Sequence, residues 1–298
     1  MSLRRHFIPW HFRHRLEVDE RSGPAEVATI WTGRLRNGRP MVPVACFLVG
    51  DTLVDSGIPG CAGRLARLAG ERGVRRALLT HHHEDHVGGA AALAASGVAV
   101  HASPATRALV RRPLPVRLYQ RLLWGPAAAV ECAPLPARVA LGPYEAEVIA
   151  APGHAVDQVA FHVRERGWLF SGDAYVVERV RVLRGDEDFA AALATLERLA
   201  ALEVETLFCA HRPVYANGGA ALARKLEHLR RIESEVRELA GHGMSRAAIA
   251  RRLGNRATRG VELFSLGDVS SRNLVRSILD GPRPRREVAE RLAAAGLG

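Results

Sequence analysis

The 298-residue sequence has no long apolar run, no closely paired cysteines and almost no lysine. Without a stretch of about 18 uncharged apolar residues, we expect no membrane-spanning helix. The N-terminal stretch MSLRRHFIPWHFRHR lacks the apolar core of a secretory signal, which predicts a cytoplasmic protein. The four cysteines are far apart and form no C-x-x-C motif, so we expect reduced thiols and no disulfide framework.

The net charge of +11 comes almost entirely from arginine spread along the chain, because Lys225 is the only lysine. Residues 213–298 carry 16 basic and 9 acidic side chains. Clustered basic side chains can neutralise nucleic-acid phosphates. A charge excess is more often a solvated face, so nucleic-acid binding by this region is the less favoured interpretation.

Alternating apolar patterns and turn residues predict three β-hairpins, in residues 44–57, 138–153 and 157–173. Helical periodicity in residues 62–73 and 187–202 leads into strand-like runs, VRRALLT and VETLFCAH. These patterns predict a mixed sheet protein with covering helices.

The strand patterns stop after Pro213, and the rest of the chain has a helical pattern. Ser245 and Ser271 are the expected N-caps in this part. We therefore expect a small helical C-terminal region.

The stretch LLTHHHEDHVGG, residues 78–89, places four histidines and two acids within six positions between an apolar strand and a helical pattern. If the chain continues extended, alternation directs His81, His83 and Asp85 to one side, away from His82 and Glu84. His86 would then lie in the first helical turn. A solvated histidine run does not account for this embedded position, and the spacing indicates metal ligation.

Three more potential metal ligands follow strand-like runs later in the chain. His154 occurs in APGH, Asp173 in LFSGD and His211 in LFCAH. Each lies where a strand ends in a loop, which is where binding sites are commonly built. Each has an ordinary interpretation taken singly, as a turn, capping or surface residue, but together they indicate one site.

The motifs THHHEDH, PGH, SGD and the late histidine, in this order, resemble the metallo-β-lactamase-fold hydrolases and, within them, the glyoxalase II-like branch. The resemblance covers roughly residues 25–215. It implies an α/β protein with a four-layer αββα sandwich in residues 1–215, followed by the helical region 216–298.

The same resemblance implies a set of site residues. Asp173 would bridge two metal ions, and Asp55 in LVDSG would orient the site from outside the ligand set. The two groups of ligands for the individual ions would be His81, His83 and His154, and Asp85, His86 and His211.

Departures from some relatives narrow the family resemblance. Zinc β-lactamases usually have a cysteine in place of Asp173, and RNA-processing relatives need a longer insertion before His211. Flavodiiron relatives add a flavodoxin domain that 83 helical residues cannot form. The glutathione-binding motifs of dedicated glyoxalase II are not found in AYVVERVRV or RPVYANGG.

Two divalent ions at such a site would share a water, lower its pKa and hold the resulting hydroxide for attack, and Asp85 and Asp173 would be the catalytic carboxylates among their ligands. We expect hydrolysis of a small-molecule thioester, lactone or other carboxylic ester, with phosphodiester or RNA cleavage as the alternative. Zinc is the first choice for this ligand set, and iron or manganese also suit it.

Residues 114–130 could roof the site and contact substrate through Arg117, Tyr119 and Trp124. The alternative is an amphipathic helix that packs Leu118, Leu122 and Leu123 on the core. Tyr175 lies two residues after Asp173, where it could touch substrate or be an ordinary loop aromatic.

Residues 243–254 and 268–281 resemble a helix-turn-helix pair. They could bind nucleic acid, or they could cover the hydrolase and shape its mouth or a dimer contact. We favour the covering role, because the helix-turn-helix pattern is weak in a single sequence.

Overall fold

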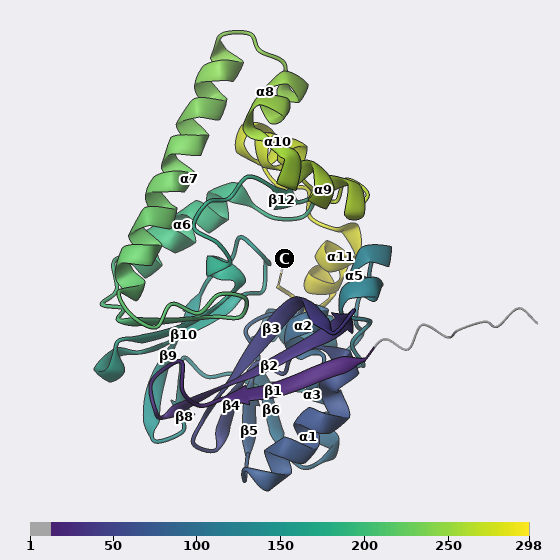
Figure 1. The fold of residues 1–298 in the computed structure, drawn as a ribbon, viewed down its shortest axis with the longest axis vertical. Helices are drawn as coiled ribbons and strands as arrows, with labels where there is room; N and C mark the ends of the chain where they lie inside the picture. The colour runs from purple at the N-terminus through teal and green to yellow at the C-terminus, as the bar shows by residue number, and fades with distance from the viewer. Residues whose placement is uncertain (1–12, 298) are drawn as a thin grey trace, which may run out of the picture.

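The computed structural model describes residues 13–297, which form two large sheets with helices on their outer faces (Figure 1). Most of the N-terminal stretch MSLRRHFIPWHFRHR lies outside the described residues. The first sheet has seven strands: β1 (His14–Asp19), β2 (Val27–Arg36), β3 (Arg39–Val49), β4 (Thr52–Val54), β5 (Arg76–Leu78), β6 (Ala99–Ala102) and β7 (Ala133–Pro134). The second has five, in the order β13-β11-β10-β9-β8: β8 (Arg138–Leu141), β9 (Tyr144–Ala150), β10 (Val159–Val163), β11 (Trp168–Gly172) and β13 (Thr206–Cys209).

All three predicted hairpins are confirmed, as β3/β4, β8/β9 and β10/β11. Gly50 and Gly142 make the first two turns with positive φ angles of 56° and 59°. The two turns touch, because a Cβ on Gly142 would lie 2.7 Å from the carbonyl oxygen of Val49. Glycine is therefore needed both for the turn conformation and for this close approach of the two sheets.

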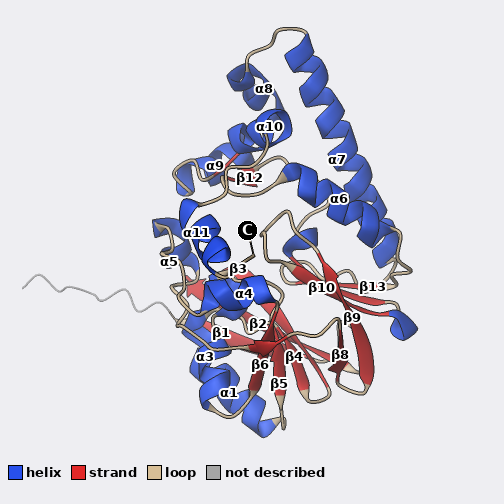
Figure 2. Cartoon of the chain, turned by 180° about the vertical axis from the view of Figure 1, so that it is seen from behind, coloured by secondary structure: helices blue, strands red, loops and turns tan. Residues whose placement is uncertain are grey.

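Helices cover both outer faces of the paired sheets (Figure 2). Leu65 and Leu93 of the helices on the first sheet pack against its outer face, and Phe47 of β3 packs against the second sheet. In β11, Trp168 and Phe170 face the inter-sheet core while Leu169 faces the helices beyond. The predicted four-layer α/β sandwich is confirmed. Its helices are α1 (Ala62–Glu71), α2 (Glu84–Val87), α3 (Ala90–Ala95), α4 (Pro104–Val110), α5 (Leu118–Leu123) and α6 (Phe189–Ala200), with short 3₁₀ turns at Pro59–Cys61, Arg164–Arg166 and Asp173–Tyr175.

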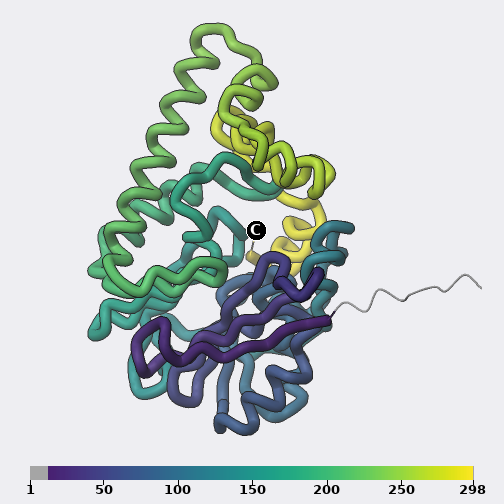
Figure 3. The backbone as a smooth tube through the Cα atoms, viewed as in Figure 1, coloured from purple at the N-terminus to yellow at the C-terminus, as the bar shows by residue number. Residues whose placement is uncertain are grey.

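The C-terminal part is largely helical, as expected, and rises from the sandwich along α7 before it returns through α9 and α11 (Figure 3). Its elements are α7 (Gly218–Gly241), α8 (Arg246–Leu253), α9 (Arg256–Phe264), β14 (Val269–Ser270), α10 (Ser271–Asp280) and α11 (Arg286–Ala294). Leu109 of α4 packs with Val288 and Leu292 of α11, which ties the end of the chain to the first half.

Two expectations for this part were wrong in detail. The N-cap of α10 is Ser270 and not Ser271, since the Ser270 hydroxyl accepts from the amide of Asn273. A strand does occur after Pro213, because β14 pairs with β12 (Leu183–Arg184) from the other half of the chain. A two-residue strand held by so distant a partner leaves no local periodic pattern. The N-cap at Ser245 is confirmed.

Two other findings bear on the expectations from composition. All four cysteines lie within the described residues, where they are buried and free. Among residues 13–297, no helix combines the length and apolar character needed to cross a membrane.

Candidate metal centre

The histidine-rich segment leaves β5 and turns into a helix sooner than alternation predicts. His83 is the extended N-cap of α2, with φ −65° and ψ 145°, so Asp85 lies in the first helical turn. The extended geometry was therefore wrong for Asp85, although its carboxylate still reaches the site. His86 lies in the short helix, as expected. His82 turns away, with Nδ1 2.7 Å from Asp157 Oδ1.

Seven side chains from four strand ends meet at one edge of the sandwich, and we call them the donor cluster. They are His81, His83, Asp85, His86, His154, Asp173 and His211. The first part of the cluster contains three imidazoles. His83 Nδ1 lies 2.8 Å from His81 Nε2 and 3.0 Å from His154 Nε2.

The second part of the donor cluster contains Asp85, His86 and His211. Asp85 Oδ2 lies 4.0 Å from His86 Nε2 and 3.7 Å from His211 Nε2. These two imidazoles therefore face the same carboxylate from different elements, α2 and the loop after β13.

Asp173 lies between the two parts of the cluster. Its Oδ1 is 3.4 Å from His86 Nε2, and its Oδ2 is 3.4 Å from both His154 Nε2 and His211 Nε2. Gly172 brings it there with a φ of 49°, and a Cβ on this glycine would lie 3.0 Å from the Thr80 side chain. The SGD motif thus combines a turn that favours glycine with a carboxylate placed between two groups of imidazoles.

Partners outside the cluster fix the orientation of its histidines. Asp55 accepts from the Thr80 amide at 2.8 Å and lies 2.8 Å from His86 Nδ1, which directs His86 Nε2 into the cluster. His154 Nδ1 lies 2.8 Å from Glu187 Oε1, and His211 Nδ1 lies 3.1 Å from the carbonyl oxygen of Pro43. Such partners select the tautomer and direction of a ligating imidazole. Sequence reasoning identified Asp55 but missed Glu187, whose only signal is its place at the start of the helical pattern of residues 187–202.

The two parts of the cluster differ in electrostatics. Burial holds the pKa of His81 and His83 well below the ordinary value, with additional lowering by His86 at His81 and by Arg184 at His83. Burial also acts to lower the pKa of His86, but Asp173 and Asp55 outweigh it and raise that pKa well above the ordinary value.

Asp173 and His211 stabilise each other's charged forms. Burial acts to raise the pKa of Asp173, but His211 and His86 hold it well below the usual range. Burial acts to lower the pKa of His211, but Asp173 raises it. The charged carboxylate and imidazolium forms are thus favoured where Asp173 meets His86 and His211, whereas burial favours the neutral form of His81 and His83.

The donor cluster fits metal ions. His86 Nε2 and Asp173 Oδ1 are buried and, among the described residues, have no hydrogen-bond partner, although both atoms point into the cluster. Buried polar atoms are nearly always satisfied by a partner, and a cation would satisfy both. Imidazole and carboxylate donors are also the ligands that zinc, iron and manganese take in proteins.

A cavity of about 800 Å³ opens onto the donor cluster, and Tyr119 and Trp124 line it. Arg117 is not among the lining residues, since its Nε pairs with Asp268 Oδ2 at 3.0 Å. Tyr175 is buried in the apolar cluster of the second sheet, and it does not line this cavity.

The amphipathic alternative for residues 114–130 was wrong for two of its three leucines. Leu123 is buried, but Leu118 is 61% and Leu122 39% exposed. Helix α5 instead buries Tyr119, whose hydroxyl donates to Asp268 at 2.8 Å. This hydrogen bond to Asp268, a residue distant in the sequence, thus stabilises the orientation in which the Tyr119 face of α5 is buried.

A family model described as the metallo-beta-lactamase superfamily matches residues 39–211. The chain belongs to this superfamily. Curated relatives called hydroxyacylglutathione hydrolase include one from Cereibacter sphaeroides, 33% identical over 169 residues, covering 56% of this chain and 59% of the relative. One from Rhodobacter capsulatus is 35% identical over 176 residues, covering 58% and 62%. The chain thus spans about three fifths of the length of these relatives.

Solved structures of this superfamily share the fold. A beta-lactamase domain protein from Burkholderia ambifaria has a TM-score of 0.62 at 21% identity, covering 88% of both chains. A metallo-beta-lactamase family protein from Thermus thermophilus has a TM-score of 0.59 at 21% identity, covering 91% of this chain and 94% of the other. With such coverage, the likeness in fold extends from the sandwich into the helical region.

Proposed function

We propose that this superfamily member is a dinuclear metal-dependent hydrolase of ester-type bonds, with thioesters as the first substrate class and lactones or other carboxylic esters next. One observation carries the proposal. The donor cluster offers seven ligands in two adjacent groups with Asp173 between them, which is more than one tetrahedral site can use.

The cluster divides into two sets of metal ligands. Asp173 would bridge the ions, which we take to be zinc, with iron or manganese as alternatives. When bound, such ions supply an activated water and a Lewis acid for the carbonyl oxygen of the substrate. The first set is His81, His83 and His154, and the second is Asp85, His86 and His211.

The protein's own groups give this site its shape. Asp55 and Glu187 hold His86 and His154 in the orientation that points Nε2 inward. Asp85 and Asp173 supply the negative charge that offsets two cations. Tyr119 and Trp124 lie on the cavity wall, where they contact a substrate, whereas Arg117 acts only through Asp268 and Tyr175 only through packing.

The thioester class is supported by the curated relatives, whose name describes hydrolysis of an acylated glutathione. Residues 1–215 contain the whole donor cluster, and the part that residues 216–298 add to the site is a portion of the cavity wall. We propose this division for the working enzyme, with a small molecule and not a nucleic acid as its partner.

The test is metal analysis of the purified protein together with a panel of thioester, lactone, carboxylic ester and phosphodiester substrates. We expect close to two ions per chain and hydrolysis of thioesters. The Asp173→Ala protein should lose about 100-fold or more in kcat together with metal, because two cations lose their shared ligand. Glu203→Ala, which removes an exposed carboxylate, is the matched control.

Three results would contradict the proposal. The first is one tightly bound ion with His86 and His211 dispensable, and the second is full activity in a folded Asp173→Ala protein. The third is cleavage of phosphodiesters alone, which would favour the nucleic-acid alternative.

A further inference from the structure

The cavity beside the donor cluster is polar at one end and apolar over most of its remaining wall. His83, Asp85, His154, Asp173 and His211 form the polar end. Away from them, the wall includes Val180, Leu183, Leu196, Leu229, Val261 and Val269. An apolar wall that continues directly from a reaction centre is suited to the part of a substrate next to the reacting carbonyl.

Three basic side chains that line this cavity donate hydrogen bonds to other groups of the protein. Lys225 Nζ donates to the carbonyl oxygen of Ala174, Arg181 Nη1 to that of Leu253, and Arg184 Nη2 to Asp186 Oδ2. Arg179 and Arg212 are exposed at the border. The interior therefore favours an apolar occupant.

The volume of about 800 Å³ lies in the upper part of the range that buries whole small ligands, roughly 300–1,000 Å³. A two-carbon acyl group would leave most of the apolar wall in contact with water. A longer chain would cover that wall, and each buried methylene raises affinity about fourfold.

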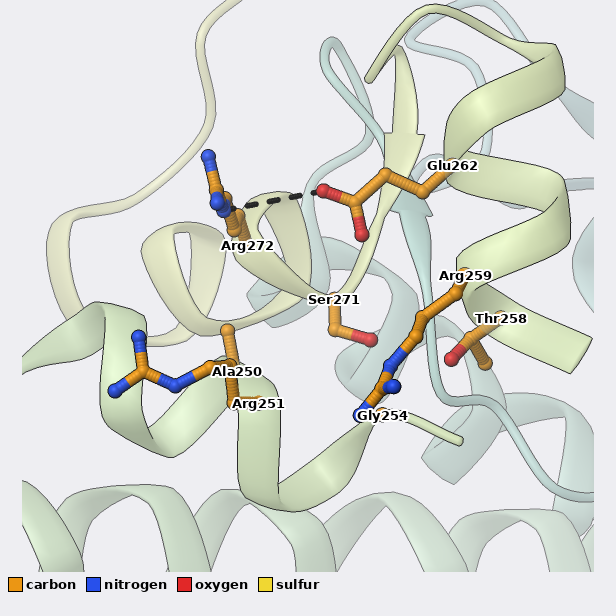
Figure 4. Close-up of a pocket in the computed structure, with 8 residues that line it drawn as sticks. All are labelled: Ala250, Arg251, Gly254, Thr258, Arg259, Glu262, Ser271 and Arg272. Atoms are coloured by element: carbon orange, nitrogen blue, oxygen red, sulfur yellow. Dashed lines mark ion pairs between the residues drawn. The ribbon is translucent and has the colours of Figure 1, made fainter. Parts of the chain in front are cut away.

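Helix α9 contributes to this wall from the C-terminal region. Val261 lines the cavity while remaining 43% exposed, and Leu263, two residues on, is 78% exposed and does not line it. A second pocket, of about 180 Å³, has a polar lining that includes Arg259, Glu262 and Arg272 (Figure 4). Ala257 and Val261 are thus the apolar side chains through which α9 lines the large cavity.

We propose that the large cavity selects thioesters with an extended apolar acyl chain, and that α9 forms part of the acyl-binding wall. The inference rests on the proposed hydrolase function. Hydrolysis adds one water across the C–S bond, which gives the carboxylic acid and the free thiol. The chain lies along the apolar wall while its carbonyl meets the donor cluster.

The test compares acetyl, butanoyl, octanoyl and decanoyl thioesters of one thiol, N-acetylcysteamine. In the native protein, kcat/KM should rise at least about tenfold from the butanoyl to the octanoyl thioester. This is only part of the gain that four fully buried methylenes would give. Val261→Asp should abolish most of that rise, because it places a charge on the acyl wall. Leu263→Asp makes the same change on the same helix outside the cavity and should keep the native preference.

A binding measurement separates this inference from the proposed function. The fluorescent fatty acid 11-dansylaminoundecanoate should bind metal-free protein and be displaced by decanoate, more weakly in Val261→Asp than in Leu263→Asp. Thioester hydrolysis without chain-length preference, or equal probe binding by the two variants, would overturn the inference alone. Probe binding that only Val261→Asp weakens, in a metal-loaded protein that cleaves none of the ester-type substrates of the panel, would support the acyl wall and overturn the hydrolase.

Discussion

His82 lies between two members of the donor cluster but belongs to a different interaction. Its imidazole pairs with the buried Asp157, which also accepts from Thr106 Oγ1 at 2.8 Å. We expect His82→Ala to keep its metal and to lose about 1–3 kcal/mol of unfolding free energy, because it leaves Asp157 short of a partner. His81→Ala should lose metal. Metal content and denaturant unfolding of both variants check this, and equal metal loss would refute the assignment.

The burial of Lys225 predicts that this residue contributes a pH-dependent term to the unfolding free energy of the protein. Burial lowers its pKa from 10.5 to about 8, partly offset by Cys209, Glu187 and Asp173. Between these two pH values the unfolded chain holds a proton that the folded chain lacks, so unfolding free energy should rise with pH, by at most about 1.4 kcal/mol per unit.

The matched variant is Lys225→Met, which cannot titrate. In metal-free protein, the native unfolding free energy minus that of Lys225→Met should increase between pH 8 and pH 10. A difference that stays level over this range would show that Lys225 keeps its ordinary pKa in the fold.

Helix α2 depends on direct contact between backbones. A Cβ on Gly88 would lie 2.3 Å from the Pro59 nitrogen and 2.5 Å from the Gly57 carbonyl oxygen. Gly88→Ala should therefore displace α2, with loss of metal and about 1–3 kcal/mol of stability. Gly70→Ala at an exposed position of α1, where a Cβ meets nothing within 4 Å, should raise the unfolding free energy by about 0.5–1 kcal/mol. Thermal unfolding and metal analysis compare the two, and similar effects would refute the contact.

The elements that the sequence predicts well are those specified by neighbouring residues. The turns at Gly50 and Gly142 and the motif glycine before Asp173 need only local conformation and alternation. The orientation of α5, the strand β14 and the role of Glu187 depend on partners far along the chain, such as Asp268 for Tyr119. Local patterns contain no information about such pairs, so α5 could not be oriented from its leucines.

At the scale of the whole molecule, one apolar cluster joins the second sheet to the C-terminal helices. Leu169 and Leu207 of the sheet share it with Leu222 of α7, Ile249 of α8 and Leu274 of α10. We expect a chain cut after residue 215 to expose this surface, bind hydrophobic dyes and lack a cooperative unfolding transition, whereas the full chain unfolds in one step. A stable, metal-loaded fragment 1–215 would contradict this.

The contact of α11 with α4 also limits how the C-terminal region can move. The region leaves the sandwich at β13 and is fastened again where Val288 and Leu292 meet Leu109. The region therefore contacts the sandwich at both of its ends, which opposes rotation of the whole region about one hinge. We therefore expect ligands to enter and leave through small side-chain movements and not through a large opening of the protein.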